Sequence, residues 1–357
     1  MATAGQVRPI NEDKMNAFLG KVVGDFGAAL SSSLVYIGQK LGLYKALVGD
    51  SVTPADLAQK TSTNERYVRE WLINQAASGY VDYDPASGRY SLSPEQTAAL
   101  TDESSPFYVG GGFYVVKAMT GAVSRIEAAF KNGGGMLWGE HDPDLFVGTE
   151  RFFRPGYAAH LIAAWIPALT GIEAKLKAGG KVADIGCGHG SSTIIMAQAY
   201  PKSRLWGFDN HEKSIETARQ RAQDAGVSDR VAFEAANASD FPDQQYDMIA
   251  FFDCLHDMGD PVGACKRAAE VLAPDGSALM VEPMAGNSVE ENFNIIGRTF
   301  SGASTLCCTA NSMALGGPAL GAVASEDAIR DTVLAGGFTQ FRRATETPFN
   351  RIFEARK

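Results

Sequence analysis

The chain has 357 residues, of which 45% are hydrophobic and 20% charged, an ordinary composition for a globular protein with one large or two modest domains. Its formal net charge of −9 gives no overall positive field for phosphate backbones or anionic lipids, which disfavours nucleic acid and membranes as partners. No uninterrupted apolar run reaches membrane-spanning length and the N-terminal residues lack the apolar centre of a signal peptide, so we expect a cytoplasmic protein.

Apolar residues recur at helical spacing near the N-terminus. They occupy one face of residues 15–30, and residues 34–41 continue the pattern as a second helical stretch. The apolar positions of the first stretch are Leu19, Val22, Val23, Phe26 and Leu30. A small domain cannot cover this face alone, so we expect a homodimer that forms through these helices.

Residues 53–93 predict two helices and a hairpin. Thr53 and Pro54 begin one helix, residues 62–65 fit a capping box for the next, and residues 80–92 alternate around a Pro/Ser/Gly turn. This is the order of elements in a winged helix. The segment has four basic side chains against five acidic ones, so it lacks the charge pattern of a DNA-binding domain.

Residues 101–175 hold glycine clusters between apolar helical stretches that are rich in aromatic side chains. We interpret them as connecting helices that cover a ligand and shape its pocket, with Tyr157 and His160 as candidate residues of a substrate pocket. The sequence therefore predicts three regions, which are residues 1–100, 101–175 and 176–357.

Residues 181–193 predict a buried strand, a glycine-rich turn and the start of a helix. The glycines are Gly186, Gly188 and Gly190. They leave no side chain between the backbone and a ligand, and the helix that follows presents free N–H groups to the turn. A dinucleotide site would have a glycine in place of Ser191, so the pattern D-x-G-x-G-x-G, which begins at Asp184, favours a different nucleotide-like ligand.

Further strands are predicted downstream, over residues 204–208, 230–234, 246–252 and 278–281. A helix near 325–335 and strands over 339–344 and 350–355 complete a seven-stranded sheet with a reversed last hairpin. Ligands bind beyond the carboxyl ends of parallel strands, so polar residues that follow the strands converge on one rim. They are Asp209 with Asn210, Asn237 with Ala238, Asp253 with His256, and Glu282. Asp209 lies 19 residues past Gly190, where a carboxylate can accept both hydroxyls of a ribose.

The glycine turn, Asp209, the segment Leu-His-Asp-Met-Gly-Asp-Pro at 255–261 and the winged helix together resemble a known family, the bacterial winged-helix class I methyltransferases. The N-terminal layout resembles the dimerisation domain of plant and bacterial small-molecule O-methyltransferases. The resemblance implies an α/β fold, a Rossmann-like seven-stranded sheet with an N-terminal helical winged-helix domain. It also implies S-adenosyl-L-methionine as cofactor, S-adenosyl-L-homocysteine as product, and a small-molecule acceptor with a hydroxyl, thiol or amine.

The resemblance assigns roles to individual residues. Implied cofactor contacts are Asp184, Gly186, Gly188, Gly190, Asp209, Asn210, Asn237, Ala238 and Asp253. Segment 255–261 is similar to the HDWSD-type segment of plant O-methyltransferases, which implies that His256 is the general base and Glu282 orients it. Met258 replaces the family's tryptophan. Asn237 stands where relatives often have an acidic residue that faces the adenine, so the adenine's partner stays open between Asn237 and Asp240.

Other chemistry is less favoured. The metal-dependent catechol-type enzymes have an Asp-Asn pair where this chain has Glu282 and Pro283, so we expect no metal. Five cysteines form no C-x-x-C pair, which suggests neither a zinc site nor a disulfide framework. The alternatives are an S-adenosylmethionine-sensing winged-helix regulator that binds DNA, against which the acidic wing argues, and a nicotinamide-dependent reductase, against which Ser191 argues.

Overall fold

The computed structural model describes residues 10–357, which form two compact units with their boundary between Asp102 and Glu103. The first unit is a winged helix that follows a long helix. Its elements are α1 (Glu12–Lys40), the 3₁₀-helix η1 (Lys45–Leu47), α2 (Pro54–Thr61), α3 (Glu65–Ala77), β1 (Asp82–Asp84), β2 (Arg89–Ser91) and α4 (Pro94–Leu100). The predicted hairpin is confirmed, since β1 and β2 pair antiparallel and Val52 bridges to Tyr90 beside them.

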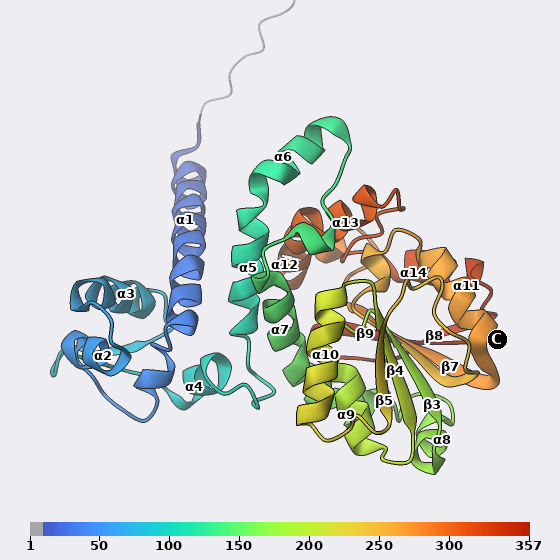
Figure 1. Ribbon diagram of the computed structural model, residues 1–357. Coiled ribbons are helices and arrows are strands. Elements are labelled where there is room, and N and C mark those ends of the chain that lie inside the picture. The colour runs from blue at the N-terminus through green and yellow to red at the C-terminus, as the bar shows by residue number, and fades with distance from the viewer. Residues whose placement is uncertain (1–9) are drawn as a thin grey trace, which may run out of the picture. The chain divides into compact units, whose positions relative to one another are not determined.

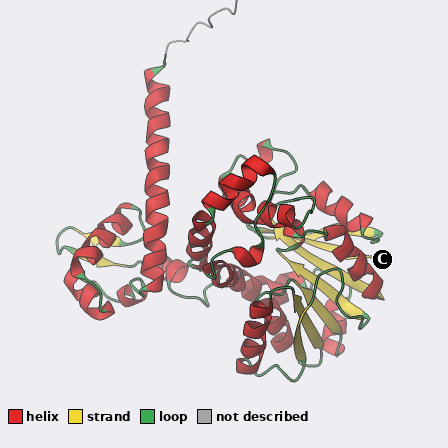
Figure 2. Cartoon of the chain, turned by 45° about the horizontal axis from the view of Figure 1, so that its top comes forward, coloured by secondary structure: helices red, strands yellow, loops and turns green. Residues whose placement is uncertain are grey.

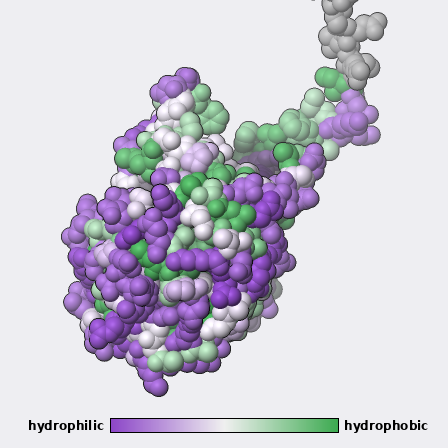
Figure 3. Space-filling model, turned by 90° about the vertical axis from the view of Figure 1, so that its right-hand side faces the viewer, coloured by the Kyte–Doolittle hydropathy of each residue, from purple (hydrophilic) through white to green (hydrophobic). Residues whose placement is uncertain are grey.

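Helix α1 is continuous, whereas the sequence suggested two stretches. Its large apolar side chains are left uncovered within the unit, and each of Leu19, Val23, Phe26 and Leu30 is at least 50% exposed. Figure 3 shows hydrophobic residues in green along the helix that follows the grey N-terminal residues. By length and composition alone α1 could also cross a membrane. Its apolar residues do not form an uninterrupted run, because Lys21 and Asp25 lie among them and form an ion pair.

The second unit is built on a seven-stranded sheet, as the sequence predicts. Its strands are β3 (Lys181–Ile185), β4 (Arg204–Asp209), β5 (Val231–Ala235), β6 (Tyr246–Phe252), β7 (Leu272–Pro283), β8 (Gln340–Glu346) and β9 (Asn350–Arg356). They lie in the order β5-β4-β3-β6-β7-β9-β8, and β9 runs antiparallel to both of its neighbours (Figure 1). From β3 the next strands along the chain, β4 and β5, are added on one side, and β6 and β7 are added on the other. The strand order therefore reverses between β3 and β6, and ligands bind at such a point in open α/β sheets.

Helices cover both faces of this sheet, as Figure 2 shows with strands in yellow between helices in red. Alternate residues of each strand point to opposite faces, so Val182 packs with α8 (Ile172–Ala178), α9 (Ser191–Ala199) and α10 (Glu212–Asp224). Ile185 packs on the other face with α11 (Pro261–Val271) and α14 (Glu326–Ala335). Both strand faces are therefore buried, which explains the nearly continuous apolar runs in the sequence.

The remaining helices precede the sheet, follow β7 or, in the case of η4, lie between β6 and α11. They are α5 (Gly111–Gly121), α6 (Val123–Asn132), η2 (Trp138–Glu140), α7 (Asp144–His160), a π-helical turn η3 (Leu161–Trp165), η4 (Leu255–Asp257), η5 (Glu290–Asn292), α12 (Ile295–Ala303), a second π-helical turn η6 (Ser304–Cys308) and α13 (Thr309–Ala314). No element is predicted from the sequence over residues 284–324, where the structure has α12 and α13. Helices α5 and α7 cross where Gly148 meets the backbone of α5.

The crossing of α5 and α7 gives a first prediction. A Cβ atom on Gly148 would lie 2.6 Å from Tyr114 Cβ and 2.8 Å from Val115 N, so Gly148→Ala forces the helices apart and should lower the free energy of unfolding by about 1–3 kcal/mol. Gly156→Ala, in the same helix with open space around it, should instead stabilise by about 0.5–1 kcal/mol. Chemical denaturation of both variants measures the difference, and equal stabilities would contradict this packing.

Candidate active site

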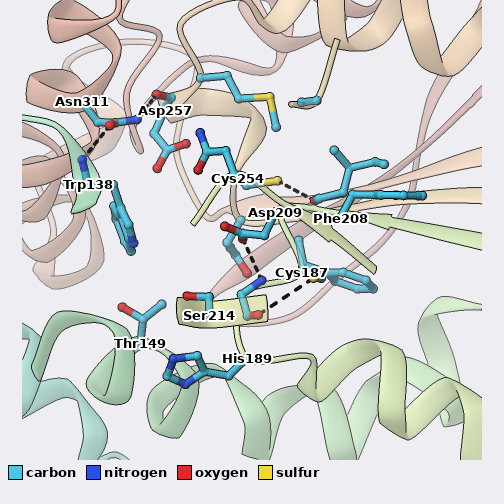
Figure 4. A pocket seen from close by; sticks show the side chains of 18 of the residues that line it. Trp138, Thr149, Cys187, His189, Phe208, Asp209, Ser214, Cys254, Asp257 and Asn311 are labelled. Atoms are coloured by element: carbon cyan, nitrogen blue, oxygen red, sulfur yellow. Dashed lines mark hydrogen bonds between the residues drawn. The ribbon is translucent and has the colours of Figure 1, made fainter. Parts of the chain in front are cut away.

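A cavity of about 450 Å³ opens at the carboxyl ends of β3, β4, β5 and β6. Its walls come from the glycine turn, the segments that follow these strands, the helix α7 and the C-terminal end of α13 (Figure 4). All of these belong to the second unit. Among the residues predicted as cofactor contacts, those that line the cavity are Gly186, Gly188, Asp209, Asn210, Asn237, Ala238 and Asp253.

The glycine turn is held in a conformation that ordinary residues avoid. Gly186, Gly188 and Gly190 have φ angles of +72°, +52° and +77°. Gly190 does not line the cavity. It packs beneath the turn, where a Cβ atom would come within 2.6 Å of the Phe233 ring. Its glycine is therefore required for packing between α9 and β5, whereas Gly186 and Gly188 bring bare backbone to the cavity.

Asp209, at the end of β4, is tied to the same turn. Its Oδ2 atom accepts a hydrogen bond from the Gly188 N–H (2.9 Å) and its Oδ1 atom accepts one from the His211 N–H (2.9 Å). Burial raises the pKa of Asp209, and the two backbone N–H groups oppose that rise. Each carboxylate oxygen keeps a further lone pair, so Asp209 can still accept hydrogen bonds from a ligand.

Asp184 is fully buried and does not line the cavity. Its Oδ2 atom accepts hydrogen bonds from the hydroxyls of Ser192 and Thr193, both at 2.6 Å, while within residues 10–357 its Oδ1 atom has no partner. Burial raises the pKa of Asp184 to about 6 although both hydroxyls oppose this. In this structure Asp184 fixes the first turn of α9, which sets the glycine turn from behind.

Asp253 follows β6 and has a φ angle of +52°, in the left-handed region that glycine, asparagine and aspartate adopt more readily than other residues. Its carboxylate accepts hydrogen bonds from Tyr157 Oη (3.0 Å) and from Asn350 Nδ2 (2.7 Å). Desolvation, and then the Glu282 carboxylate, raise the pKa of Asp253 to about 8. Tyr157 lines the cavity as predicted, whereas His160 lies outside the lining and stacks on Trp165 with ring centroids 6.1 Å apart.

His256 and Glu282 are brought together, with Nδ1 of the imidazole 2.7 Å from Glu282 Oε2. Glu282 Oε1 also accepts a hydrogen bond from the Leu255 N–H (3.2 Å). The two side chains are buried, with His256 3% and Glu282 0% exposed, and neither lines the cavity. Burial lowers the pKa of His256, but the Glu282 carboxylate and the Cys308 thiol outweigh it and hold this pKa well above its ordinary value. The cavity wall at this point is formed by the next residue, Asp257.

Helix α7 is fastened to the glycine turn by Glu150. Its carboxylate accepts a hydrogen bond from Ser191 Oγ (2.7 Å) and forms ion pairs with Arg154 (2.8 Å) and Arg221 (2.9 Å). Burial raises the pKa of Glu150, but Arg221 outweighs this and lowers it. The same helix stacks Phe146 on His211, 4.3 Å between ring centroids.

Sequence reasoning missed several lining residues, which are Trp138, Phe146, Glu150, Asp257, Asn311 and Leu315. Asp257 stands next to His256 in the motif and could have been found there. The others have no local signal. The backbone N–H of Trp138 donates a hydrogen bond to Asn311 Oδ1 (2.8 Å) across 173 residues of chain, a contact that only the tertiary fold creates.

The cysteines and possible metal ligands give no further site. All five cysteines are free, and burial raises the pKa of Cys187 and Cys254 well above the ordinary value, so these thiols stay protonated. Burial likewise lowers the pKa of His189 beside the turn. Within residues 10–357 no group of three or more His, Cys, Asp or Glu side chains has the arrangement of a metal site. The absence of a metal cofactor stays a prediction.

Comparison with known families agrees with both units. Residues 176–327 match the model of a methyltransferase domain, and residues 28–102 match an Rv2258c-like winged helix-turn-helix domain. The chain is 41% identical over 103 residues, 28% of its own length, to 27-O-demethylrifamycin SV methyltransferase of Amycolatopsis mediterranei strain S699. That match spans about 38% of the relative, so the chain covers well under two thirds of it.

Solved structures share the whole fold at low sequence identity. The mitomycin 7-O-methyltransferase MmcR has a TM-score of 0.73 at 17% identity, covering 97% of this chain and 100% of that one. Human N-acetylserotonin methyltransferase, solved in complex with S-adenosylmethionine, has a TM-score of 0.68 at 16% identity, covering 100% and 99%. The chain therefore joins a methyltransferase domain to an N-terminal winged helix-turn-helix domain, with a fold that these solved structures share.

Proposed function

We propose that this protein transfers the methyl group of S-adenosyl-L-methionine to a small-molecule acceptor and releases S-adenosyl-L-homocysteine. The observation that carries the proposal is the joining of Asp209 to the glycine turn at the cavity wall. Gly186 and Gly188 offer bare backbone, and Asp209 offers lone pairs for the two hydroxyls of a ribose. When bound, the cofactor supplies a methyl group activated by a sulfonium. The protein's task is to align the acceptor and exclude water.

The proposal for the acceptor covers several kinds of acceptor atom. The relative from A. mediterranei and the two structural neighbours named above are methyltransferases of small molecules, and one of them, the mitomycin 7-O-methyltransferase, is an O-methyltransferase by name. We propose a hydroxyl, thiol or amine acceptor that enters beside Tyr157. His160 is not proposed as a direct contact because it lies outside the cavity lining.

We propose that the winged helix serves assembly and not DNA binding, and that the protein is cytoplasmic. Every basic side chain of residues 53–93 is engaged in an ion pair. The pairs are Lys60–Asp50, Arg66–Glu70, Arg69–Glu65 and Arg89–Asp56. A surface neutralised in this way releases few counterions from a phosphate backbone. The exposed apolar face of α1 is instead suited to a second copy of the chain.

Cofactor binding is tested by replacing Asp209. Asp209→Ala leaves the ribose hydroxyls without their acceptor and should weaken S-adenosylmethionine binding by about 1–3 kcal/mol, measured by calorimetry. Asp224→Ala is the matched control, since this carboxylate is exposed on α10 and lies outside the cavity lining. Titration of the full chain with NADH and with duplex DNA separates the two alternatives. An unchanged affinity in Asp209→Ala would remove Asp209 from the site.

Dimerisation is tested on α1. Replacing Phe26 and Leu30 with serine removes apolar area from the proposed interface and should shift the protein from dimer to monomer in light scattering at micromolar concentration. Tyr67→Ser is the control because Tyr67 is 80% exposed on α3 and outside this face. A wild-type protein that is already monomeric under these conditions, and does not aggregate, rejects the interface.

We also propose that Glu282 fixes the tautomer of His256 and raises its proton affinity, the arrangement expected of a base with its orienting carboxylate. Because the folded-state pKa of His256 lies above its ordinary 6.5, the stabilisation is complete below about 6.5 and is lost as pH rises through the folded-state value. Glu282→Gln should lower the free energy of unfolding by about 3–5 kcal/mol at pH 6, and by less at higher pH.

The pKa of His256 can be followed in Glu282→Gln by NMR of the imidazole, and it should fall. Glu270→Gln is the control, since this carboxylate is exposed on α11. If His256 titrates identically in wild type and Glu282→Gln, the pair does not have the proposed coupling.

A further inference from the structure

The side of the cavity nearest His256 is built from Asp257, Met258 and three residues from elsewhere in the chain, Trp138, Asn311 and Leu315. Figure 4 shows Asp257, Asn311 and Trp138 together on one side, away from Thr149 and His189. This side holds large apolar surfaces and a carboxylate, and it contains none of the predicted cofactor contacts.

Helix α13 fixes this wall through two polar side chains. Asn311 Nδ2 donates a hydrogen bond to the backbone carbonyl of Asp257 (2.9 Å), and Asn311 Oδ1 accepts one from the backbone N–H of Trp138 (2.8 Å). Ser312 Oγ donates to the Met258 carbonyl (2.7 Å). The backbone that carries Asp257 is therefore held from behind, so its side chain has a defined position at the cavity.

The Asp257 carboxylate accepts a hydrogen bond from its own backbone N–H and keeps lone pairs that the protein leaves unused. Within residues 10–357 no other side chain donates a hydrogen bond to it, and in Figure 4 it points toward the cavity. Desolvation raises the pKa of Asp257 to about 7, with His256 opposing and Glu282 and Asp209 adding to the rise. A carboxyl group that is partly withdrawn from water and has unused lone pairs gains stability from any ligand that brings a hydrogen-bond donor or a positive charge.

The charge of the cavity points the same way. Its acidic lining residues are Glu150, Asp209, Asp253, Asp257 and Asp260, and the lining, which lies wholly in the described part of the chain, contains no lysine or arginine. Ion pairs neutralise Glu150, and Asp253, with its pKa raised to about 8, is mostly protonated near pH 7, so the charged carboxylates are those of Asp209, Asp257 and Asp260. A cationic sulfonium suits such a site, whereas a second ligand with a carboxylate or phosphate would meet repulsion that nothing on the wall offsets.

We propose that Asp257 is the acceptor-binding carboxylate, that the acceptor is a neutral or cationic molecule with an O–H or N–H donor, and that anionic acceptors are excluded. This rests on the proposed methyl transfer. The acceptor's lone pair forms the new bond to the methyl carbon, the carbon–sulfur bond breaks with its electrons going to sulfur, and the acceptor's proton goes to the Asp257 carboxylate. His256, held on Glu282 behind the wall, is then a positioning residue.

The test uses matched phenols that differ in charge: tyrosol (neutral), tyramine (cationic) and 4-hydroxyphenylacetate (anionic). Binding to the full-length protein saturated with S-adenosylhomocysteine is measured by ligand-detected NMR, and methylation is measured with labelled S-adenosylmethionine. We expect the neutral and cationic members to bind at least tenfold more tightly than the anion. Asp257→Asn should reduce this ratio, with the remaining lining carboxylates keeping it above one, while Asp224→Asn, which changes an exposed carboxylate on α10, should leave it unchanged.

Two results overturn the proposal. One is an anionic member that binds as well as its neutral partner, and the other is a protein that binds S-adenosylhomocysteine but none of the neutral or cationic members. With any phenol that is methylated, the acidic limb of the rate–pH profile should disappear in Asp257→Asn and persist in His256→Gln, and the reverse outcome assigns the proton to His256. Failure to bind S-adenosylmethionine at all would sink the proposed function itself, and is seen separately by calorimetry.

Discussion

Three carboxyl groups withdrawn from bulk water at the carboxyl ends of β3, β6 and β7 hold the cavity together, because each requires hydrogen-bond donors and the donors come from different elements. Asp184 takes them from the first turn of α9, and Asp253 takes them from α7 and β9. Glu282 takes them from η4. An unpaired carboxylate in such surroundings costs more than most packing defects, so these bonds fix where the covering elements sit on the sheet.

This arrangement explains which parts of the molecule the sequence could predict. The strands follow from short, nearly continuous apolar runs and the glycine turn from its spacing, and both are confirmed at nearly the expected residues. Asp209 reaches the cavity because it directly ends a strand. Such features depend on a few neighbouring residues, so local pattern is enough to locate them.

Features that depend on distant partners were not predictable in the same way. The sequence places His256 and Glu282 as neighbours, which the structure confirms at 2.7 Å, but it does not show that their bond turns the imidazole away from the cavity and leaves Asp257 on the wall. That outcome depends on η4, whose backbone is bonded to Glu282 on one side and to α13 on the other. The bond from α13 could not be predicted, because no element was predicted over residues 284–324.

The left-handed backbone at Asp253 restricts what mutation can do at this position. A φ of +52° is readily adopted by glycine, asparagine and aspartate, so most single substitutions would strain the end of β6. Glycine would relax the backbone but leave Tyr157 and Asn350 without their acceptor. Asparagine would face two donors with one carbonyl oxygen and an NH₂ group of its own. Almost every single substitution at position 253 should therefore be destabilising, and a tolerated change there requires compensating changes on α7 and β9.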